Sequence, residues 1–214
     1  MSNTGARATT GSTDASNGGP LLVVISGPSS SGKDSVLGCL RDRHYPAHFT
    51  VTATTRRKRE VRPEDHAFLE FLTDGEFEDL LRNDGLLEHA EVYGYHYGVP
   101  KAPLREAIDS GKDVIMRVDV QGAETIKKLV PATVLIFLTL ASIQEIATRI
   151  RARGRDDEET VQRRLKAAVR ELDELPKFDY AVVNERDRLD ETVDKVEAIL
   201  LAERCRVGRA QVTL

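Results

Sequence analysis

The sequence lacks the features of a secreted or membrane-spanning protein. Its two cysteines, Cys39 and Cys205, are far apart and form no CxxC pair, so they provide no metal site and fit a reducing cytoplasm. The longest apolar runs, such as VLIFL at 134–138, are far too short to span a membrane. Residues 1–19 are rich in Ser, Thr, Gly and Asn and contain no apolar core of the signal-peptide kind. We therefore expect a cytoplasmic protein with a disordered N-terminal tail and no membrane partner.

The composition also lacks an excess of positive charge. The 31 Lys and Arg residues are outnumbered by 35 Asp and Glu residues, which gives a formal net charge of −4. This balance argues against a protein whose main function is to coat nucleic acid, so we expect no nucleic-acid partner. A chain of 214 residues is long enough for one compact α/β domain with a small insertion. A homodimer is a possible assembly of such a domain.

What the sequence does contain is a regular alternation of apolar runs and helical patterns. This alternation is typical of a parallel sheet with crossover helices. We expect strands at 21–26, 49–54, 113–119, 133–140 and 180–184, and helices at 34–44, 101–110, 122–129, 143–153, 158–175 and 189–203. The VLIFL run is apolar on both faces, as in a strand that helices cover on both sides.

The region between Arg56 and Tyr97 departs from this alternation. It is charged and aromatic, and we expect one short helix at 74–83 between less regular segments. Most of the aromatic residues fall in this region, at Phe68, Phe71, Phe77, Tyr93, Tyr95 and Tyr97. We interpret the region as an insertion that has a small core of its own and packs over the main sheet.

The most specific chemical signal is the segment GPSSSGK, which matches G-x-x-x-x-G-K. It follows an expected strand and precedes an expected helix, which is the context that a phosphate-binding loop requires. Gly27 and Gly32 permit a close approach of the backbone to phosphate oxygens, and Lys33 can bridge the terminal phosphates. The loop residues expected to bind a nucleotide are Gly27, Pro28, Ser29, Ser30, Ser31, Gly32 and Lys33. A Gly/Ser turn without a chemical role is the alternative.

Asp34 stands where a Ser or Thr usually binds magnesium in such loops. A first-turn aspartate suits the helix dipole, and Ser35 supplies a hydroxyl one position later, as in some nucleotide kinases. We interpret Ser35 as the hydroxyl on the Mg²⁺ side, and Asp34 as a helix cap or a water-mediated partner of the metal. The alternative is a loop that has lost metal binding.

A second phosphate-binding pattern follows the second expected strand, in TATTRRKRE. Arg56 and Arg59 are separated by two residues and can clamp a phosphate through paired hydrogen bonds. A solvated basic run or a nucleic-acid patch is the alternative interpretation. Further along, LLEHAEVYGYHYGVP and IMRVDVQGAE each end a strand-like run in polar groups, where ligands gather in parallel sheets.

Taken together, these segments resemble the guanylate kinase family, from about residue 21 to residue 201. The resemblance rests on the ordered set GPSSSGK, TATTRRKR, LLEHAEVYGYHYGVP, VDVQGAE, RARGRDDEETVQRRL and YAVVNE. It implies a P-loop NTPase-type three-layer α/β fold over 20–206 with a parallel central sheet, and phosphate transfer from ATP, with Mg²⁺, to GMP or dGMP. The implied parts are a core at 20–51 and 99–206, an inserted GMP-binding region at 52–98, a lid at about 153–163 and a C-terminal tail at 207–214.

The resemblance also implies roles for individual residues. Arg56 and Arg59 would hold the GMP phosphate together with Tyr97, whereas Thr52, Glu88 and Asp119 would contact guanine. Arg149, Arg153 and Arg164 would serve the lid and the transfer site, beside Lys33 and Arg56 as catalytic residues. Asn184 would approach the adenine side of ATP.

The sequence departs from the family pattern at several positions besides Asp34. Ser30 replaces a usual glycine, and Val99 replaces a Ser or Thr that contacts guanine. Arg117 replaces a common acidic residue. The segment EDHAFLEF lacks a phosphate-contacting tyrosine, and its nearest aromatic residue is Phe68.

Two other functions compete with a GMP kinase. A kinase of another small phosphorylated acceptor, such as a ribose bisphosphate, would suit GPSSSGKDS but would not need Glu88 and Asp119. A non-catalytic guanylate-kinase-like binding domain would tend to lose Lys33 and the two clamp arginines. In a GMP kinase the acceptor phosphate is already largely ionised near neutral pH, so we assign no general base to the histidines.

Overall fold

The structure, a computed structural model, describes residues 18–58, 61, 63–92, 94–152 and 157–214. Most of the expected N-terminal tail therefore lies outside the described residues. The strands are β1 Leu22–Ser26, β2 Ala47–Phe49, β3 Thr52–Thr54, β4 Leu69–Phe71, β5 Leu86–Val92, β6 Tyr95–Pro100, β7 Asp113–Arg117, β8 Val134–Thr139 and β9 Tyr180–Val183. The helices are α1 Lys33–Asp42, α2 Asp74–Arg82, α3 Lys101–Asp109, α4 Val120–Leu129, α5 Ile143–Ala152, α6 Glu158–Asp173 and α7 Leu189–Arg204, with 3-10 turns at Pro63–Phe68 and Leu175–Lys177.

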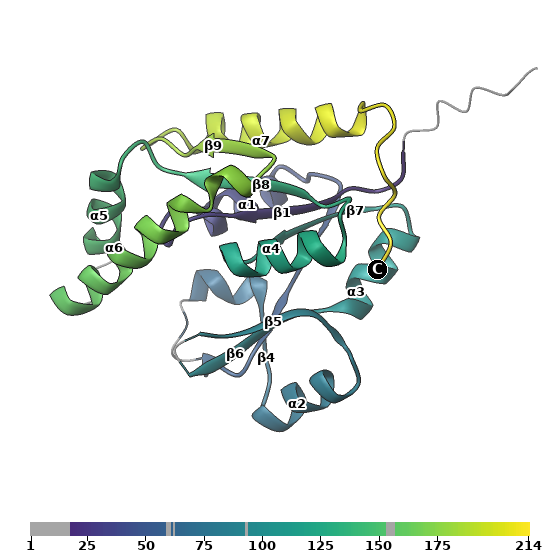
Figure 1. Ribbon diagram of the computed structural model, residues 1–214, viewed down its shortest axis with the longest axis horizontal. Coiled ribbons are helices and arrows are strands. Elements are labelled where there is room, and N and C mark those ends of the chain that lie inside the picture. The colour runs from purple at the N-terminus through teal and green to yellow at the C-terminus, as the bar shows by residue number, and fades with distance from the viewer. Residues whose placement is uncertain (1–17, 59–60, 62, 93, 153–156) are drawn as a thin grey trace, which may run out of the picture.

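A parallel sheet in the order β2-β7-β1-β8-β9 forms the middle layer. All residues of the central strand β1 are buried, and they alternate between the two faces. Val23 and Ile25 pack with side chains of α1 and α7, whereas Leu22 and Val24 pack with side chains of α3 and α4. Helices thus cover both faces of the sheet (Figure 1), which confirms the expected three-layer α/β fold.

The expectation of a single strand at 49–54 is wrong, because the chain passes from one sheet to another within this segment. β2 pairs with β7 in the central sheet, whereas β3 pairs with β4 and β6 in a second sheet. The backbone N–H of Thr50 still donates to the carbonyl of Ile115, at 3.0 Å, and Val51 is exposed at the crossing. The apolar alternation of FTVTAT continues through this point, so the pattern alone does not mark the change.

The second sheet, in the order β4-β3-β6-β5, makes up most of the insertion. Less regular segments were expected here, and that expectation is wrong for β4, β5 and β6. The expected small core exists around the buried residues Ala53, Phe77 and Leu86. Phe68 is not part of it, because this side chain packs into the core beneath α1 and α7. Tyr93 lies outside the described residues.

Helices α5 and α6 form a separate arm at one end of the molecule (Figure 1). They pack on each other through a small apolar cluster that includes Ile146, Ile150 and Val161. The side chain of Asp157 caps α6 by accepting a hydrogen bond from the Thr160 N–H, at 2.7 Å. The expected lid at about 153–163 is described only from residue 157 onward.

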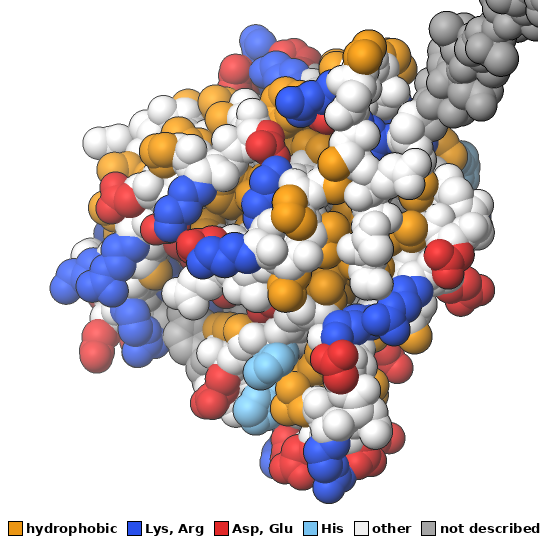
Figure 2. Space-filling model, turned by 45° about the vertical axis from the view of Figure 1, so that its right-hand side comes forward, with side chains coloured by type: hydrophobic (Ala, Val, Ile, Leu, Met, Phe, Trp, Pro, Cys, Tyr) orange, Lys and Arg blue, Asp and Glu red, His pale blue; other side chains and the backbone are white. Residues whose placement is uncertain are grey.

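The C-terminal segment after α7 packs against the body of the molecule. Val212 and Leu214 contact the apolar core beneath α3 and α4, and the Arg209 guanidinium donates to the carbonyl of Pro20, at 3.1 Å. Acidic and basic side chains are interspersed on the face seen in Figure 2. Among the described helices, none combines the length and the apolar character needed to cross a bilayer.

Candidate active site

A cavity of about 410 Å³ lies between the phosphate loop and the second sheet. The carboxyl ends of β1 and β7 open into it, which is where ligands bind in parallel α/β sheets. The structure brings eight of the expected site residues together around this cavity: Gly27, Ser29, Lys33, Thr52, Arg56, Glu88, Tyr97 and Asp119. Residues that are far apart in the sequence therefore share one site.

The phosphate loop requires glycine at both ends of its motif. Gly27 has a φ of +134°, and a Cβ atom there would lie 2.0 Å from the carbonyl oxygen of Leu138. Gly32 has a φ of +96°, and a Cβ atom there would lie 2.3 Å from Nδ2 of Asn184. Any larger residue would clash at both positions and would strain the backbone. The loop is therefore held tightly against β8 and the segment after β9.

Ser30 adopts a backbone conformation that favours glycine. Its φ is +71°, in the left-handed region that non-glycine residues rarely adopt. Its Oγ atom is buried and has no hydrogen-bond partner among the described residues. The serine is thus tolerated in the loop rather than favoured by it.

The ammonium group of Lys33 folds back over the loop. It donates hydrogen bonds to the carbonyls of Gly27, at 2.6 Å, and Pro28, at 3.1 Å. Burial lowers the pKa of Lys33, and the nearby carboxylates of Glu171 and Asp34 act in the opposite direction. The side chain lines the cavity from the loop side, where it can meet the terminal phosphates of a nucleotide.

Glu171 of α6 also reaches the phosphate loop, and sequence reasoning missed it. Its Oε2 accepts a hydrogen bond from the backbone N–H of Ser29, at 3.2 Å, and its side chain lines the cavity. Burial raises the pKa of Glu171. In the sequence this residue belongs to a charged stretch that is typical of a solvated helix face, so no local signal distinguishes it.

Glu88 and Asp119 form an acidic pair on the opposite side of the cavity. Glu88 projects from β5, and Asp119 caps α4 by accepting a hydrogen bond from the Gly122 N–H, at 2.8 Å. Burial, with a further contribution from the Asp119 charge, raises the pKa of Glu88 to about 7. Two carboxylates beside one another in a half-buried site favour a ligand that presents N–H donors.

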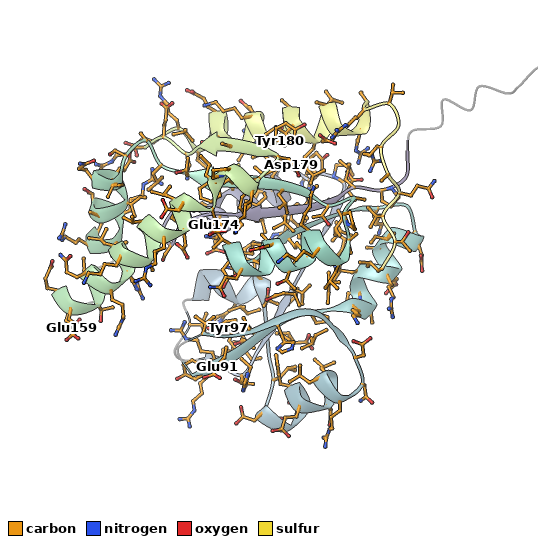
Figure 3. The ribbon with its side chains drawn as sticks, viewed as in Figure 1. Glu91, Tyr97, Glu159, Glu174, Asp179 and Tyr180 are labelled. Carbon is orange, nitrogen blue, oxygen red and sulfur yellow. The ribbon has the colours of Figure 1, made fainter. Side chains whose placement is uncertain are left out.

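Arg56 and Tyr97 lie on neighbouring parts of the second sheet. Tyr97 of β6 pairs with Thr54 of β3, and the hydroxyl of Thr54 accepts a hydrogen bond from the backbone N–H of Arg56, at 3.1 Å. Figure 3 shows Tyr97 and Glu91 on this sheet. The second clamp residue, Arg59, lies outside the described residues.

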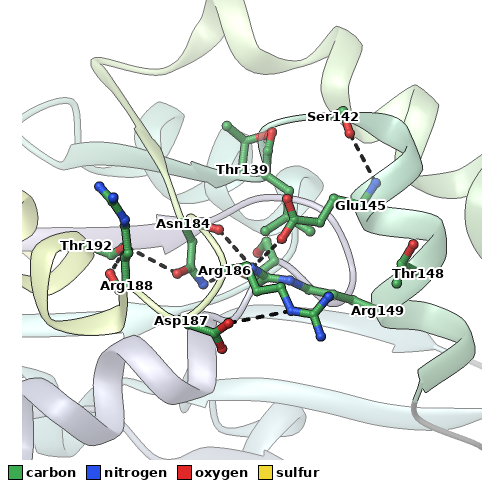
Figure 4. A network of polar contacts seen from close by, with 12 residues as sticks. Thr139, Ser142, Glu145, Thr148, Arg149, Asn184, Arg186, Asp187, Arg188 and Thr192 are labelled. Atoms are coloured by element: carbon green, nitrogen blue, oxygen red, sulfur yellow. Dashed lines mark hydrogen bonds and ion pairs between the residues drawn. The ribbon is translucent and has the colours of Figure 1, made fainter.

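A second cavity, of about 320 Å³, opens on the other side of the loop and includes Gly32, Ser35, Arg149 and Asn184. The Asn184 amide donates to the carbonyl of Ser31, at 2.7 Å, and accepts from the hydroxyl of Thr192, at 3.2 Å. Arg149 donates to Glu145, at 2.8 Å, and to the carbonyl of Asn184, at 3.0 Å (Figure 4). Asn184 therefore supports the phosphate loop through its side chain and lies beside the cavity.

Of the expected residues that the structure describes, five line neither cavity. Pro28, Ser30, Ser31 and Asp34 lie in or beside the loop, and Arg164 is half-buried on α6. Arg153 lies outside the described residues. Two of the departures from the family pattern are core residues: Val99 is fully buried beneath α3 and α4, and Phe68 is buried beneath α1 and α7.

Comparisons with known proteins identify the family of the chain. The guanylate kinase family model matches residues 20–203. The chain is 42% identical to a guanylate kinase of Clostridium perfringens over 91% of its own length and 88% of the relative, and 41% identical to that of Clostridium acetobutylicum over 88% of each. The crystal structure of guanylate kinase from Anaplasma phagocytophilum aligns with a TM-score of 0.69 at 30% identity, covering 90% of both chains. The chain belongs to the guanylate kinase family.

Proposed function

We propose that this protein transfers the terminal phosphate of ATP to GMP and dGMP. The observation that carries the proposal is the single cavity that joins the phosphate-loop lysine, Lys33, to the acidic pair of Glu88 and Asp119. The first group suits the phosphates of a donor nucleotide, and the second suits the base of an acceptor. The names of the relatives support the same reaction.

Guanine recognition rests on the acidic pair. Guanine presents two adjacent donors, the ring N–H and the exocyclic amine, and one carboxylate can accept from both. Adenine presents an acceptor at the ring position, so a carboxylate there would face a lone pair. A site built on such hydrogen bonds can reject the wrong base by a factor of about 10⁴. We assign this contact to Glu88, with Asp119 and Thr52 beside it.

The transfer itself needs charge neutralisation rather than a general base. An oxygen of the ionised GMP phosphate attacks the γ-phosphorus of ATP, a new P–O bond forms, and the bond to the β–γ bridging oxygen breaks to release ADP. Lys33 lies at the donor phosphates, and Arg56, with Arg59, holds the acceptor phosphate in line. Arg149, Arg153 and Arg164 are assigned to the donor side and the lid.

Magnesium would be held mainly by the nucleotide. Among the described residues, no cluster of three or more His, Cys, Asp or Glu side chains forms a cation site. The exposed hydroxyl of Ser35 beside the second cavity is the hard oxygen ligand that Mg²⁺ accepts. When bound there, the ion would neutralise charge on the donor phosphates.

The competing functions fit the site less well. A ribose bisphosphate offers no pair of N–H donors for Glu88 and Asp119, so the half-buried carboxylate of Glu88 would then lack a partner in the cavity. A binding domain without catalysis would not need a lysine placed on the carbonyls of its phosphate loop, as Lys33 is. Both alternatives remain distinguishable by a direct assay.

The test is an ADP-release assay with Mg-ATP and five separate acceptors: GMP, dGMP, AMP, UMP and a ribose bisphosphate. We expect turnover with GMP and dGMP, and at least a 10³-fold lower kcat/KM with AMP, on the order of the discrimination that unmade hydrogen bonds give. Comparable turnover of AMP, or of the ribose bisphosphate, would contradict the proposal. The Glu88→Gln variant should lose most of the preference for GMP, whereas Glu91→Gln, an exposed change on the same strand, should keep it.

A further inference from the structure

Arg117 lines the main cavity, although no expected role includes it. It is the last residue of β7, and it lies beside Ile25 of β1, two residues before Gly27 of the phosphate loop. Its side chain is 19% exposed and borders the same cavity as Lys33 and Arg56. The guanidinium is therefore placed between the loop and the second sheet.

The partners of Arg117 hold it in place without using all of its donors. Its Nη1 forms an ion pair with Oδ1 of Asp34, and its guanidinium carbon lies 5.5 Å from the centroid of the buried Phe68 ring. Its Nε is buried with no hydrogen-bond partner among the described residues. An arginine carries five N–H donors, so this one retains donors for a further acceptor.

The local electrostatics favour an anion at this point. Lys33 and Arg117 both line the cavity. Burial is the main cause that lowers the pKa of Lys33; the charges of Glu171 and Asp34 oppose this, and that of Arg117 acts in the same direction as burial. Two cations that repel each other in a half-buried cavity gain most from a doubly charged group between them. A phosphoryl group in transfer, with charge on three oxygens, is such a group.

We propose that Arg117 is a catalytic residue that contacts the transferred phosphoryl group, and that Asp34 is the positioning residue that orients it. This inference rests on the proposed GMP kinase function. It also gives Asp34 a role that needs no contact with metal: the carboxylate replaces the usual hydroxyl and fixes the guanidinium at the mouth of the loop. The hydroxyl on the metal side remains that of Ser35.

The test compares kcat and KM for Arg117→Gln, Arg117→Lys and a matched control, Arg41→Gln. Arg41 is exposed, and its guanidinium carbon lies 4.9 Å from the same Phe68 ring, but it does not border the cavity. Arg117→Gln should lower kcat by about 100-fold, the usual loss for one donor to developing charge, with both KM values within about threefold. Arg117→Lys keeps the positive charge but not the planar, two-pronged set of guanidinium donors, and its kcat should fall by about 10-fold. Arg41→Gln should stay within about twofold of the unmodified protein.

Asp34 is tested by Asp34→Asn in two backgrounds. If Asp34 acts through Arg117, the change should lower kcat by about 10-fold in the unmodified protein and by less than about twofold in Arg117→Gln. The same loss in both backgrounds would overturn the positioning role, because Asp34 would then act independently. Thermal unfolding of each variant shows whether it is folded. If Arg117→Gln does not fold, Asp34→Asn is measured in the Arg117→Lys background instead.

The outcomes separate this inference from the function on which it rests. An unmodified protein that does not phosphorylate GMP would refute the proposed function itself. An active protein in which Arg117→Gln or Arg117→Lys behaves like Arg41→Gln would refute the catalytic role of Arg117 alone. A rise in the KM for GMP with an unchanged kcat would also overturn it, because the contact would then be to the acceptor phosphate in the ground state.

Discussion

The two halves of the cavity are built in different ways. The donor half is a loop of backbone groups that follows β1, a strand whose residues are all buried between two sheet neighbours and two helical layers. The acceptor half rests on a second sheet, in which β3 and β4 have three residues each and the buried core consists of Ala53, Phe77 and Leu86. One half binds through a rigid local motif, and the other through side chains that separate elements bring together.

This difference predicts how the two halves respond to substitution. Backbone amides of the donor loop cannot be replaced one at a time, so its side-chain dependence should concentrate on Lys33. The acceptor half has no such loop, so each of its side chains should contribute separately to the affinity for GMP.

Lys33→Ala should have the largest effect of a single substitution. Removal of the one lysine on the loop carbonyls should lower kcat by at least about 10³-fold, because the charge on the donor phosphates is no longer neutralised. The control is Lys128→Ala, an exposed lysine on α4, which should leave kcat unchanged. An ADP-release assay measures both, and a loss of less than tenfold for Lys33→Ala would show that the loop does not depend on this residue.

Arg56→Ala should weaken only the acceptor half. The loss of a charge-assisted contact to the GMP phosphate, worth about 1.5–3 kcal/mol, should raise the KM for GMP by about 10- to 100-fold. The KM for ATP should change by less than about twofold, because ATP binds the other half. Arg57→Ala, at the exposed neighbouring arginine, provides the control. Equal increases in both KM values would remove Arg56 from the acceptor site.

The pH dependence of GMP binding should report on Glu88, whose pKa is raised to about 7. Guanine requires the ionised carboxylate, so the KM for GMP should rise by about tenfold as the pH falls from 8 to 6. Glu91→Gln should show the same pH profile of the KM for GMP as the unmodified protein, including the titration of the GMP phosphate. Glu88→Gln should show only the phosphate titration. Identical profiles for the two variants would contradict the assignment.

The same raised pKa predicts the opposite trend for the stability of the free protein. Below the ordinary pKa of 4.5 the Glu88 carboxyl is protonated in both the folded and the unfolded state. As the pH rises from 4.5 through 7, the Glu88 carboxyl ionises first in the unfolded state, which lowers the free energy of the unfolded state relative to the folded state. The free energy of unfolding therefore falls over this pH range. The melting temperature should therefore fall less steeply between pH 5 and pH 8 in Glu88→Gln than in Glu91→Gln.

The smallest expected effect is a gain in stability from Ser30→Gly. A serine at a φ of +71° is strained by about 1–2 kcal/mol relative to glycine, and the greater flexibility of glycine in the unfolded chain offsets part of this. The free energy of unfolding should rise by about 0.5 kcal/mol, as measured by urea denaturation. Ser29→Gly is the control, because the neighbouring Ser29 does not have a positive φ. This change should lower the free energy of unfolding. A loss of stability in Ser30→Gly would show that the serine makes a contact of its own.

The sequence predicts the donor half more completely than the acceptor half for a physical reason. The phosphate loop is a continuous segment whose glycines, lysine and flanking strand are all visible locally. In the second sheet, β3 pairs with β4 and β6, which lie further along the chain, and it was merged with β2. β5 and β6 are neighbours in the sequence and pair with each other, but LLEHAEVYGYHYGVP was read only as a strand-like run, without two assigned strands. The central strands and most helices were placed within a few residues, because the spacing of apolar residues within each segment indicates its secondary structure.

Two features of the site depend on contacts that no single-sequence pattern contains. Glu171 approaches the phosphate loop across the fold, at a sequence separation of 142 positions from Ser29. Arg117 and Asp34 each look like an isolated departure from the family pattern, and their ion pair appears only when β7 and α1 are placed in space. Side-chain pairs of this kind are set by tertiary packing rather than by spacing along the chain.

Titration calorimetry of two variants with two ligands tests the separation of the halves most directly. Lys33→Ala and Glu88→Gln are each titrated with GMP alone and with Mg-ATP alone. We expect Lys33→Ala to lose affinity for ATP and retain its affinity for GMP, and Glu88→Gln to do the reverse, by about 10-fold or more in each case. If both variants lose the same ligand, or if each loses both ligands equally, the cavity does not contain separate donor and acceptor halves.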